Sequence, residues 1–406
     1  MKFVNVLFVV LLYCTHLSAQ VTLPNNLYFT HIGVEDGLCQ NTVCCILQDH
    51  LGFIWLGTKD GLTRYDGYRF RVFKHGAAVP MSIGNNFIRV LYEDADGLIW
   101  IGTNVGVYIY NPETENFRKF DVATERGDVI SREVSSIKCD SSGDLWIGVN
   151  WQGVFRYDRR DESLELYEPV PGDTTSLSSV HVWDLCFDGD GNLWVGSQNG
   201  GLDRYDRETD RFVRHRLKGL SDVSRIVLDK QNQLLLGTMK DGLFSFNPYM
   251  GTCQPLLLDS GHKDLFVRAI FVRNSREVVV GTENGIYIYD CVTRKTRHVN
   301  QELGNPYSLS CKAVYSIYCD KEGALWIGTY FGGVNYLPPS SSLIFDKFYP
   351  IGHSDRLSGK AVREFVRDES GIIWIGTEDP GLTRFDPVSG KFTHYNSRNS
   401  GLSCDN

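Results

Sequence analysis

Two aromatic side chains stand outside the pattern that organises the rest of this chain. Trp151 and Trp183 are the two of eight tryptophans that fall outside a repeated motif, and His181 lies beside the second. An exposed indole can stack on the apolar face of a sugar ring, while nearby amides and charges fix the sugar hydroxyls. We therefore treat Trp151, Trp183 and His181 as candidate ligand-binding residues. The alternative is that both indoles plug a central channel or pack on loops.

Further polar and aromatic residues occur at related positions of other repeats. Some repeats offer amide or aromatic groups in a turn, and several predicted inner strands are preceded by an arginine. A ring of arginines would suit a sulfated or uronic-acid glycan, because a guanidinium binds such anions through paired hydrogen bonds. The additional candidates are Gln198, Asn199, Tyr330, Phe331, Asn86 and Arg89, with Arg132, Arg225 and Arg268 as the other arginines.

The sequence contains no recognisable catalytic motif. The ten histidines lack the spacing of metal ligands, and neither a Gly-x-Ser-x-Gly motif nor a Walker-type loop occurs. Four acidic residues fall in predicted turns, mostly of separate repeats: Asp60, Glu283, Glu378 and Asp379. We expect no catalytic residue, no cofactor and no metal site. A propeller glycosidase or lyase and a protein-docking scaffold stay open as alternatives, because fold alone does not decide function.

Charge and cysteine usage narrow the possible partners. The net charge is −8 and no run of lysine and arginine occurs, so we expect no nucleic-acid partner. No Cys-x-x-Cys pair is present. Cys44 and Cys45 are neighbours on a predicted strand, point to opposite faces and cannot readily bridge each other. Three further cysteines near the repeated Asp are expected to be small buried residues of inner strands: Cys139, Cys186 and Cys319.

Eight copies of one motif position these residues. The second glycine of the motif recurs at intervals of 45, 46, 48, 41, 44, 47 and 48 residues. These glycines are Gly57, Gly102, Gly148, Gly196, Gly237, Gly281, Gly328 and Gly376. A period in the forties made of short β-prone runs is typical of β-propeller blades with four strands each. We therefore predict an all-β fold, a β-propeller of four-stranded blades.

The first repeat shows how one blade is expected to form. Its strands are predicted over residues 43–48, 54–56, 62–65 and 69–73. The motif Asp accepts hydrogen bonds from turn amides, and the Gly three positions later can adopt a positive φ. In the fifth repeat Asn232 replaces that Gly, and Asn tolerates the same conformation. The Asp-to-Gly segment is therefore interpreted as a turn rather than an active site.

A tryptophan recurs on the second strand of most repeats. We expect it to pack as a large plate against the neighbouring blade. Repeats five and six carry Leu235 and Val279 in this position, so their blades are expected to be the least regular. The repeat tryptophans are Trp55, Trp100, Trp146, Trp194, Trp326 and Trp374.

Composition along the chain suggests four segments. Residues 1–19 read as a secretory signal peptide, because an eleven-residue apolar run is too short to span a bilayer as an anchor. Residues 20–337 are predicted to form a seven-bladed ring whose seventh blade takes an outer strand from residues 27–32. A linker is expected over 338–344, where two prolines preclude a central strand, and 345–406 would begin a second ring. A single eight-bladed ring is the alternative.

The repeat itself resembles a known family. The copy containing Asp94, Gly97, Trp100, Gly102 and Tyr110 follows the pattern Asp-x-x-Gly-x-[Ile/Leu]-Trp-Ile-Gly-Thr-x-x-Gly-Leu-x-x-[Tyr/Phe]-Asp, with Asn in the final place. This pattern is similar to the two-component regulator propeller repeat of the periplasmic sensors in hybrid two-component systems of gut Bacteroidetes. In that family two seven-bladed propellers precede a small β-sandwich domain, a membrane helix and a histidine kinase.

The resemblance carries functional expectations. It implies an exported, periplasmic sensor region that binds an oligosaccharide and controls glycan-utilisation genes, as part of a longer, membrane-anchored homodimer. The phosphotransfer modules are absent from this chain, and the resemblance implies that it corresponds to the N-terminal part of such a sensor. Binding positions differ among family members, so the resemblance does not select the candidate residues named above.

Overall fold

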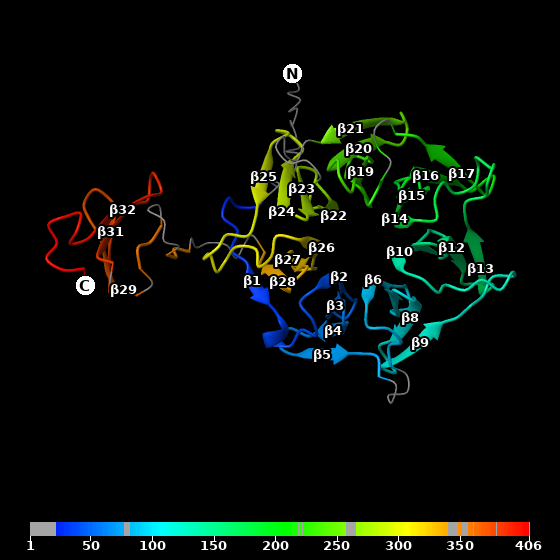
Figure 1. Ribbon diagram of the computed structural model, residues 1–406, viewed down its shortest axis with the longest axis horizontal. Coiled ribbons are helices and arrows are strands. Elements are labelled where there is room, and N and C mark those ends of the chain that lie inside the picture. The colour runs from blue at the N-terminus through cyan, green and yellow to red at the C-terminus, as the bar shows by residue number, and fades with distance from the viewer. Residues whose placement is uncertain are drawn as a thin grey trace, which may run out of the picture.

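The regular secondary structure of the described residues is almost entirely β-strand. The computed structural model describes residues 22–76, 82–217, 220, 222–256, 265–339, 347–350, 356–359, 361–378 and 380–405. Within these residues one 3-10 helix, η1 (Val34–Asp36), accompanies 32 strands in eight four-stranded antiparallel sheets (Figure 1). The predicted all-β fold is thus confirmed. The predicted signal peptide lies outside the described residues.

The sheets follow the repeat order of the sequence. The first sheet contains β2 (Val43–Gln48), β3 (Ile54–Thr58), β4 (Gly61–Tyr65) and β5 (Phe70–Phe73), in close agreement with the predicted strands. The next three sheets are made of β6 (Ile88–Glu93), β7 (Ile99–Thr103), β8 (Gly106–Asn111) and β9 (Asn116–Phe120); β10 (Val134–Cys139), β11 (Leu145–Val149), β12 (Gly153–Asp158) and β13 (Ser163–Tyr167); and β14 (Val182–Phe187), β15 (Leu193–Ser197), β16 (Gly201–Asp206) and β17 (Arg211–His215).

The remaining sheets have the same internal order. The fifth and sixth contain β18 (Arg225–Leu228), β19 (Leu234–Gly237), β20 (Leu243–Asn247) and β21 (Thr252–Leu256); and β22 (Val267–Val272), β23 (Glu277–Thr282), β24 (Gly285–Asp290) and β25 (Thr296–Val299). The seventh and eighth contain β26 (Val314–Cys319), β27 (Leu325–Thr329), β28 (Val334–Leu337) and β1 (Thr30–Ile32); and β29 (Val362–Arg367), β30 (Ile373–Thr377), β31 (Leu382–Asp386) and β32 (Lys391–Tyr395).

Seven of the sheets close into a ring. Each inner strand contacts the next around the centre, from β2 through β6, β10, β14, β18 and β22 to β26, and β26 contacts β2. The first strand of the chain, β1, completes the seventh sheet by pairing antiparallel with β28, with His31 opposite Asn335. The N-terminal run therefore supplies the outer strand predicted for it. The ring closes with seven sheets, and the eight-membered alternative does not form.

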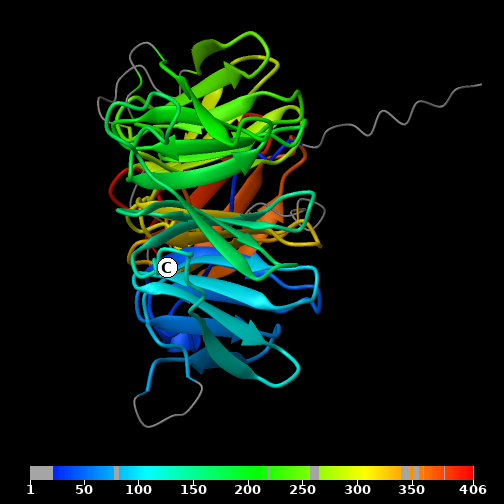
Figure 2. The same cartoon turned by 90° about the vertical axis from the view of Figure 1, so that its right-hand side faces the viewer.

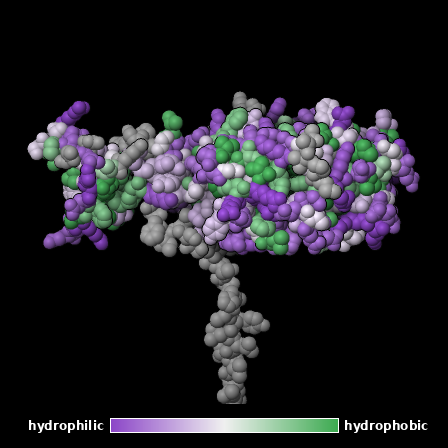
Figure 3. All heavy atoms as spheres, turned by 90° about the horizontal axis from the view of Figure 1, so that it is seen from below, coloured by the Kyte–Doolittle hydropathy of each residue, from purple (hydrophilic) through white to green (hydrophobic). Residues whose placement is uncertain are grey.

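The eighth sheet stands beside the ring. Seen edge-on, the ring is a disc one sheet deep (Figure 2), and the eighth sheet forms a separate lobe next to it (Figure 3). Its inner strand is exposed: Val362 is 44% accessible, whereas Val43 at the same position of the first sheet is completely buried. Strand β28 ends at Leu337, directly before the two prolines of the predicted linker. Residues 340–346 of the connection lie outside the described part.

Neighbouring blades are joined by the repeat tryptophans. In the ring each indole packs on an aromatic residue in the third strand of the next sheet, with ring centroids 4.7 to 6.0 Å apart. The contact from the seventh sheet back to the first closes the series and confirms the predicted packing role. The pairs are Trp55 with Tyr110, Trp100 with Tyr157, Trp146 with Tyr205, Trp194 with Phe246, and Trp326 with Tyr65.

The repeat Asp has two tasks, one of which the sequence did not suggest. Asp188 Oδ1 accepts the turn amides of Asp190 and Asn192, and Asp188 Oδ2 accepts the indole Nε1 of Trp194 at 2.8 Å. The same Asp-to-Trp hydrogen bond, six residues apart, recurs in the other sheets that keep both residues. Asn232 adopts φ 60°, as expected for the residue that replaces the turn glycine. One carboxylate thus holds both the turn and the tryptophan ring that packs between two blades.

The sixth sheet departs from the motif in sequence but not in regularity. Its strands β22, β23 and β24 each keep six residues, so our expectation of an irregular blade is wrong there. The physical reason is a substitute brace: buried Glu277 accepts the backbone amide of Leu23 at 2.9 Å and pairs with Arg273. The N-terminal segment thereby docks where Arg273 replaces the repeat Asp and Val279 replaces the repeat Trp. The fifth sheet is less regular, in line with the expectation: β18 and β19 have four residues each, and their pairing lacks the register shift found in the other sheets.

Candidate ligand-binding mouth

The candidate residues gather on one face of the ring because of how each sheet turns. The turn between the second and third strands bonds to the segment that leads into an inner strand. Trp151 N, for example, donates to Val180 O at 2.9 Å, and Tyr330 N donates to Ala313 O at 3.0 Å. We call the face formed by these turns and lead-in segments the mouth. It surrounds the ends of the inner strands at the ring centre.

A bulge on the inner strands selects which residues line the mouth. In seven of the eight sheets, the pairing of the inner strand with the second strand skips one residue of the inner strand, always at the same place. Such a β-bulge changes the direction in which the skipped side chain points. Each skipped residue lies 13 positions before the second glycine of its motif, as Trp183 does before Gly196. The skipped residues are Cys44, Arg89, Ser135, Trp183, Arg268, Tyr315 and, in the eighth sheet, Arg363.

The third and fourth sheets form an aromatic corner of the mouth. Trp151, in the turn between β11 and β12, is 61% exposed and meets the His181 ring edge to face, with centroids 4.0 Å apart. His181 Nδ1 also lies 3.2 Å from Asn150 Oδ1, so the turn of one blade is fastened to the lead-in of the next. Trp183 follows two residues later at the bulge and is half-buried. The structure therefore places all three leading candidates on one side of the mouth.

The mouth contains polar atoms whose bonding capacity is unused. Trp183 Nε1 is buried and has no hydrogen-bond partner among the described residues. The same holds for Ser135 Oγ, on the adjacent inner strand, and for Asn104 Oδ1, in the turn between β7 and β8. A buried donor without a partner costs about 1–3 kcal/mol. A ligand that accepts from the indole N–H, after a side-chain movement that exposes this nitrogen, would recover that cost.

A second aromatic group lies where the seventh sheet meets the first. Tyr330 stacks on Tyr315 at 5.1 Å and touches Phe331 at 4.0 Å between ring centroids. Lys59 Nζ sits 4.2 Å from the Tyr330 ring centroid, and Phe331 is 66% exposed. Tyr330 and Phe331 are candidates from the sequence, whereas Tyr315 and Lys59 are not. Tyr315 could have been identified as a mouth residue from its position 13 residues before Gly328, which the other bulged residues share relative to their motif glycines.

The arginines reach the mouth but are not free to act as an anion-binding ring. Arg89 pairs with Glu133 of the next sheet, and Arg268 pairs with Glu283 in its own sheet. Arg225 donates to the carbonyl oxygens of Arg268 and Ser224 at 2.7 and 2.8 Å. The fourth candidate, Arg132, forms no ion pair with any described residue. Carboxylates thus neutralise two of the arginines that the sequence alone suggested were available to bind an anion.

These side chains converge on the ring centre from opposite blades. Burial raises the pKa of the Cys44 thiol to about 11, and the charges of Arg89, Lys59, Arg268 and Arg225 act against that rise. Burial also lowers the pKa of Arg89 and of Arg225. Charges from four different sheets therefore act on one thiol at the centre. Cys44 and Cys45 do not bridge each other.

Three other candidates act mainly as braces of the loops. Gln198 N donates to His181 O, and Asn199, at φ 59°, donates its amide to Asp222. Asn86 bonds to Asp60 through its side chain and accepts from His75 N, so it ties the first turn to the second lead-in. These residues shape the rim of the mouth. Within the described part of the chain, no group of three or more His, Cys, Asp and Glu side chains could hold a metal ion.

The comparisons with known proteins agree with this architecture. A family model described as "Two component regulator propeller" matches residues 37–60, 82–105, 176–199 and 308–331. Each match covers a lead-in, an inner strand, the second strand and the start of the turn after it. Over 59 residues the chain is 37% identical to Histidine kinase P4 of Formosa agariphila, which is 14% of this chain and 4% of that protein.

Solved structures extend the likeness over the whole fold. The chain superposes with a TM-score of 0.77 and 27% identity on the extracellular domain of the putative hybrid two component system BT3049 from B. thetaiotaomicron, covering 94% of this chain and 50% of that one. It thus spans about half the length of that domain.

A virginiamycin B lyase from Staphylococcus aureus shares the fold alone, at 12% identity and a TM-score of 0.58, over 77% of this chain and 99% of the lyase. No helix among the described residues is long and apolar enough to cross a membrane. The chain is therefore a β-propeller in which four repeats match the two-component regulator propeller model, and its fold is similar to the extracellular domain of a putative hybrid two component system.

Proposed function

We propose that this chain is the ligand-sensing part of a two-component sensor and that its mouth binds an oligosaccharide. The observation that carries the proposal is the aromatic corner: Trp151 stands exposed on His181, beside Trp183 with its unused indole N–H. Indole faces suit the apolar face of a pyranose, and a buried N–H suits a hydroxyl or ring oxygen. The likeness to an extracellular domain of a hybrid two-component system supports a sensing role.

The charge pattern favours a neutral oligosaccharide over a heavily sulfated one. Arg89 and Arg268 already hold carboxylate partners, so a sulfate would have to displace Glu133 or Glu283. Hydroxyl groups can bond to both members of such a pair without separating them, because each hydroxyl donates and accepts. A sugar carrying single uronic acids could still reach the unpaired Arg132. The mouth thus fits a mainly uncharged chain.

The wider biological role extends this proposal to the longer protein. We infer that the eighth sheet is the first blade of a second propeller, because its exposed inner strand matches strands that are buried in the ring. Ligand binding would shift the packing of a homodimer of this sensor and so bias an attached histidine kinase that controls glycan-utilisation genes. Export to the periplasm would follow from the predicted signal peptide. The chain itself would act without catalysis.

The direct test is a binding panel. The full chain is titrated with neutral, uronic-acid-containing and sulfated oligosaccharides by calorimetry. Saturable binding of one class, with the neutral class strongest, supports the proposal. Binding only of highly sulfated chains would overturn the charge argument. Failure of every oligosaccharide, together with capture of a protein partner at the mouth, would favour the docking-scaffold alternative.

A further inference from the structure

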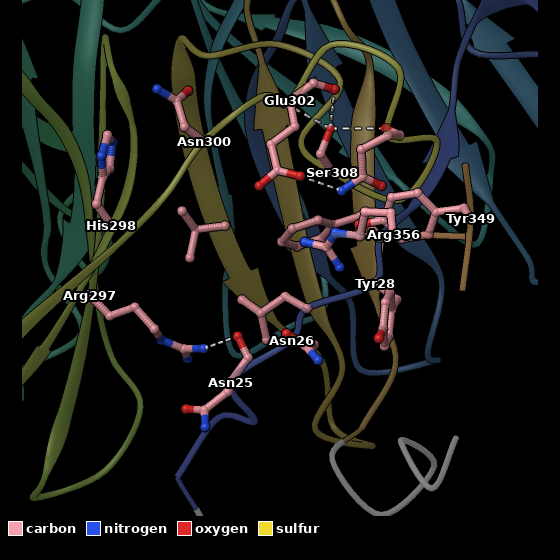
Figure 4. Close-up of a pocket in the computed structure, with 14 residues that line it drawn as sticks. Asn25, Asn26, Tyr28, Arg297, His298, Asn300, Glu302, Ser308, Tyr349 and Arg356 are labelled. Carbon is pink, nitrogen blue, oxygen red and sulfur yellow. Dashed lines mark hydrogen bonds between the residues drawn. The ribbon is translucent and has the colours of Figure 1, made fainter. Parts of the chain in front are cut away.

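A second hollow lies at the junction between the ring and the chain that leads to the eighth sheet. It measures about 150 Å³ and is bounded by three stretches far apart in sequence: residues 25–29, residues 297–308, and the pair Tyr349 and Arg356 (Figure 4). Pockets for drug-sized ligands are larger, at roughly 300–1,000 Å³. The size of this hollow therefore suits a single small ring. It is separate from the mouth, since none of the mouth candidates lines it.

The walls of this junction pocket are held in place by their own hydrogen bonds. Arg297 donates to the carbonyl oxygens of Pro24 and Asn25 at 2.5 and 2.7 Å, which fixes the N-terminal wall. Ser308 Oγ bonds to Glu302 O and Asn305 O at 3.2 and 3.0 Å, which fixes the loop wall. A pocket whose walls are ordered before binding pays less entropy when the ligand arrives.

The third wall comes from the segment before the eighth sheet. Tyr349 is almost fully buried and packs edge-on against Tyr307, with ring centroids 5.6 Å apart. Lys347 Nζ lies 4.3 Å from the same Tyr307 ring, so this segment is attached to the ring through aromatic contacts. Arg356 lies over the Tyr349 ring at 5.5 Å and forms no ion pair with any described residue.

The chemistry of the lining matches a polyhydroxylated ring. Figure 4 shows Glu302 and Arg356 extending into the same space, with Asn25 and Asn300 on other walls and the Tyr28 ring beside them. Carboxamides and a Glu–Arg combination offer both donors and acceptors, which neighbouring hydroxyls require, and a tyrosine ring can cover the apolar face of a sugar. A purely anionic ligand would meet the Glu302 carboxylate, and a purely apolar one would leave these polar groups unpaired.

We propose that this junction pocket binds one monosaccharide unit, at a second site that is independent of the mouth. The sugar would touch both the ring and the segment leading to the eighth sheet, and would therefore fix the one against the other. Glu302 would accept hydroxyl hydrogens and Arg356 would donate to hydroxyl or carboxylate oxygens. A ligand site here would let occupancy bias the relative placement of the two parts.

The test uses three probes on the full chain: D-glucose, D-galactose and D-glucuronate, followed by saturation-transfer NMR and calorimetry. We expect saturable binding of at least one probe. Glu302→Ala and Arg356→Ala should each weaken it by about tenfold or more. Arg398→Ala makes the same charge change as Arg356→Ala at an exposed residue away from the pocket and should leave binding unchanged.

A mouth variant separates this proposal from the one above. Trp183→Phe should leave monosaccharide binding intact, because Trp183 does not line the junction pocket. Circular dichroism checks that each variant keeps the fold. The proposal is overturned if no probe gives a saturable signal, if both pocket variants bind as well as the parent chain, or if Trp183→Phe alone abolishes binding.

Discussion

The indole of Trp151 meets the imidazole of His181 edge to face, with centroids 4.0 Å apart and the ring planes at 82°. The contact joins a turn of the third blade to the lead-in of the fourth, 30 residues further along the chain. An exposed tryptophan is useful for stacking only if its ring is held in one orientation, since ordering it on binding costs affinity. His181 supplies that support from the neighbouring blade.

His181→Ala is therefore expected to weaken oligosaccharide binding, because the His181 side chain supports the Trp151 indole that stacks on the ligand. Loss of the edge contact should lower affinity by about two- to tenfold, the range of an aromatic pair. Calorimetric titration with the oligosaccharide found in the binding panel measures this change. Tyr68→Ala, at a 94% exposed tyrosine in the turn between β4 and β5, serves as the control. Equal affinity of the His181 variant and the parent would contradict a supporting role.

The indole nitrogen of Trp183 allows stability and binding to be separated. Trp183→Phe removes a buried N–H that has no partner in the described structure, so the free energy of unfolding should stay the same or rise. Oligosaccharide affinity should fall by about two- to tenfold because the ligand loses one donor.

Trp100→Phe is the matched comparison for this substitution. Trp100 Nε1 donates to Asp94 at 2.8 Å, so its removal leaves a buried carboxylate oxygen with one bond fewer and should destabilise the ring by about 1–3 kcal/mol. Urea unfolding of both variants measures the change in stability, and calorimetric titration measures the change in oligosaccharide affinity. A loss of stability in Trp183→Phe equal to that in Trp100→Phe would show that the Trp183 N–H is satisfied in the folded protein.

The double task of the repeat Asp predicts different costs in different blades. Asp188→Ala leaves the Trp194 indole N–H and two turn amides without their acceptor, which should lower the free energy of unfolding by about 2–3 kcal/mol. Asp229→Ala, in the blade where Leu235 replaces the tryptophan, removes only turn bonds and should cost about 1 kcal/mol. Urea unfolding midpoints measure both. Equal losses would mean that the indole bond contributes nothing.

Asp203 gives the ring a predictable response to pH. Burial raises its pKa from 3.8 to about 6, against the opposing effect of hydrogen bonds from Ser178. The folded state therefore binds the Asp203 proton more tightly than the unfolded chain. The stability contributed by the protonated form is fully present below about pH 4 and is lost as the pH rises through about 6.

Asp203→Asn should remove this dependence. Asn335 occupies the equivalent position in the seventh sheet and accepts the amide of Ser310 at 2.8 Å, so an asparagine fits the site. Relative to the parent, the variant should gain about 2–3 kcal/mol of stability between pH 4 and pH 7. Unfolding measured at both pH values checks the sign. A parent and variant that change in parallel would contradict a raised pKa.

The sequence was sufficient to predict the ring but not the pairing of charges within it. Strand β2 lies where it was expected, because a β-prone run between turn residues has few other solutions. The Arg89–Glu133 pair was missed because its members are 44 residues apart and meet only when two blades pack. Arg89, Trp183 and Tyr315 could have been grouped from sequence by their constant distance to the motif glycine. All three line the mouth because they occupy the bulged position of an inner strand, and no particular residue type marks that position in the sequence.

The junction pocket lay further beyond sequence reasoning. It joins the N-terminal segment, the end of β25 with the connection from the sixth sheet to the seventh, and the chain after the linker, and these stretches lie outside the Asp-to-Trp part of the repeat. The hydrogen bond between Glu277 and Leu23 was also beyond sequence reasoning. Departures from the repeat motif in the sixth repeat predict an irregular blade, not a new contact that stabilises it. Both features depend on contacts between stretches that are far apart in the sequence.

The most direct test of the central claim is calorimetric titration of the Trp151→Ala/Trp183→Ala double variant with the oligosaccharide that binds the parent chain. If the aromatic corner forms the binding site, affinity should fall by at least about 30-fold. The urea unfolding midpoint should change little, because Trp151 is exposed and Trp183 is half-buried. Unchanged affinity in a folded double variant would contradict the assignment of ligand binding to the mouth.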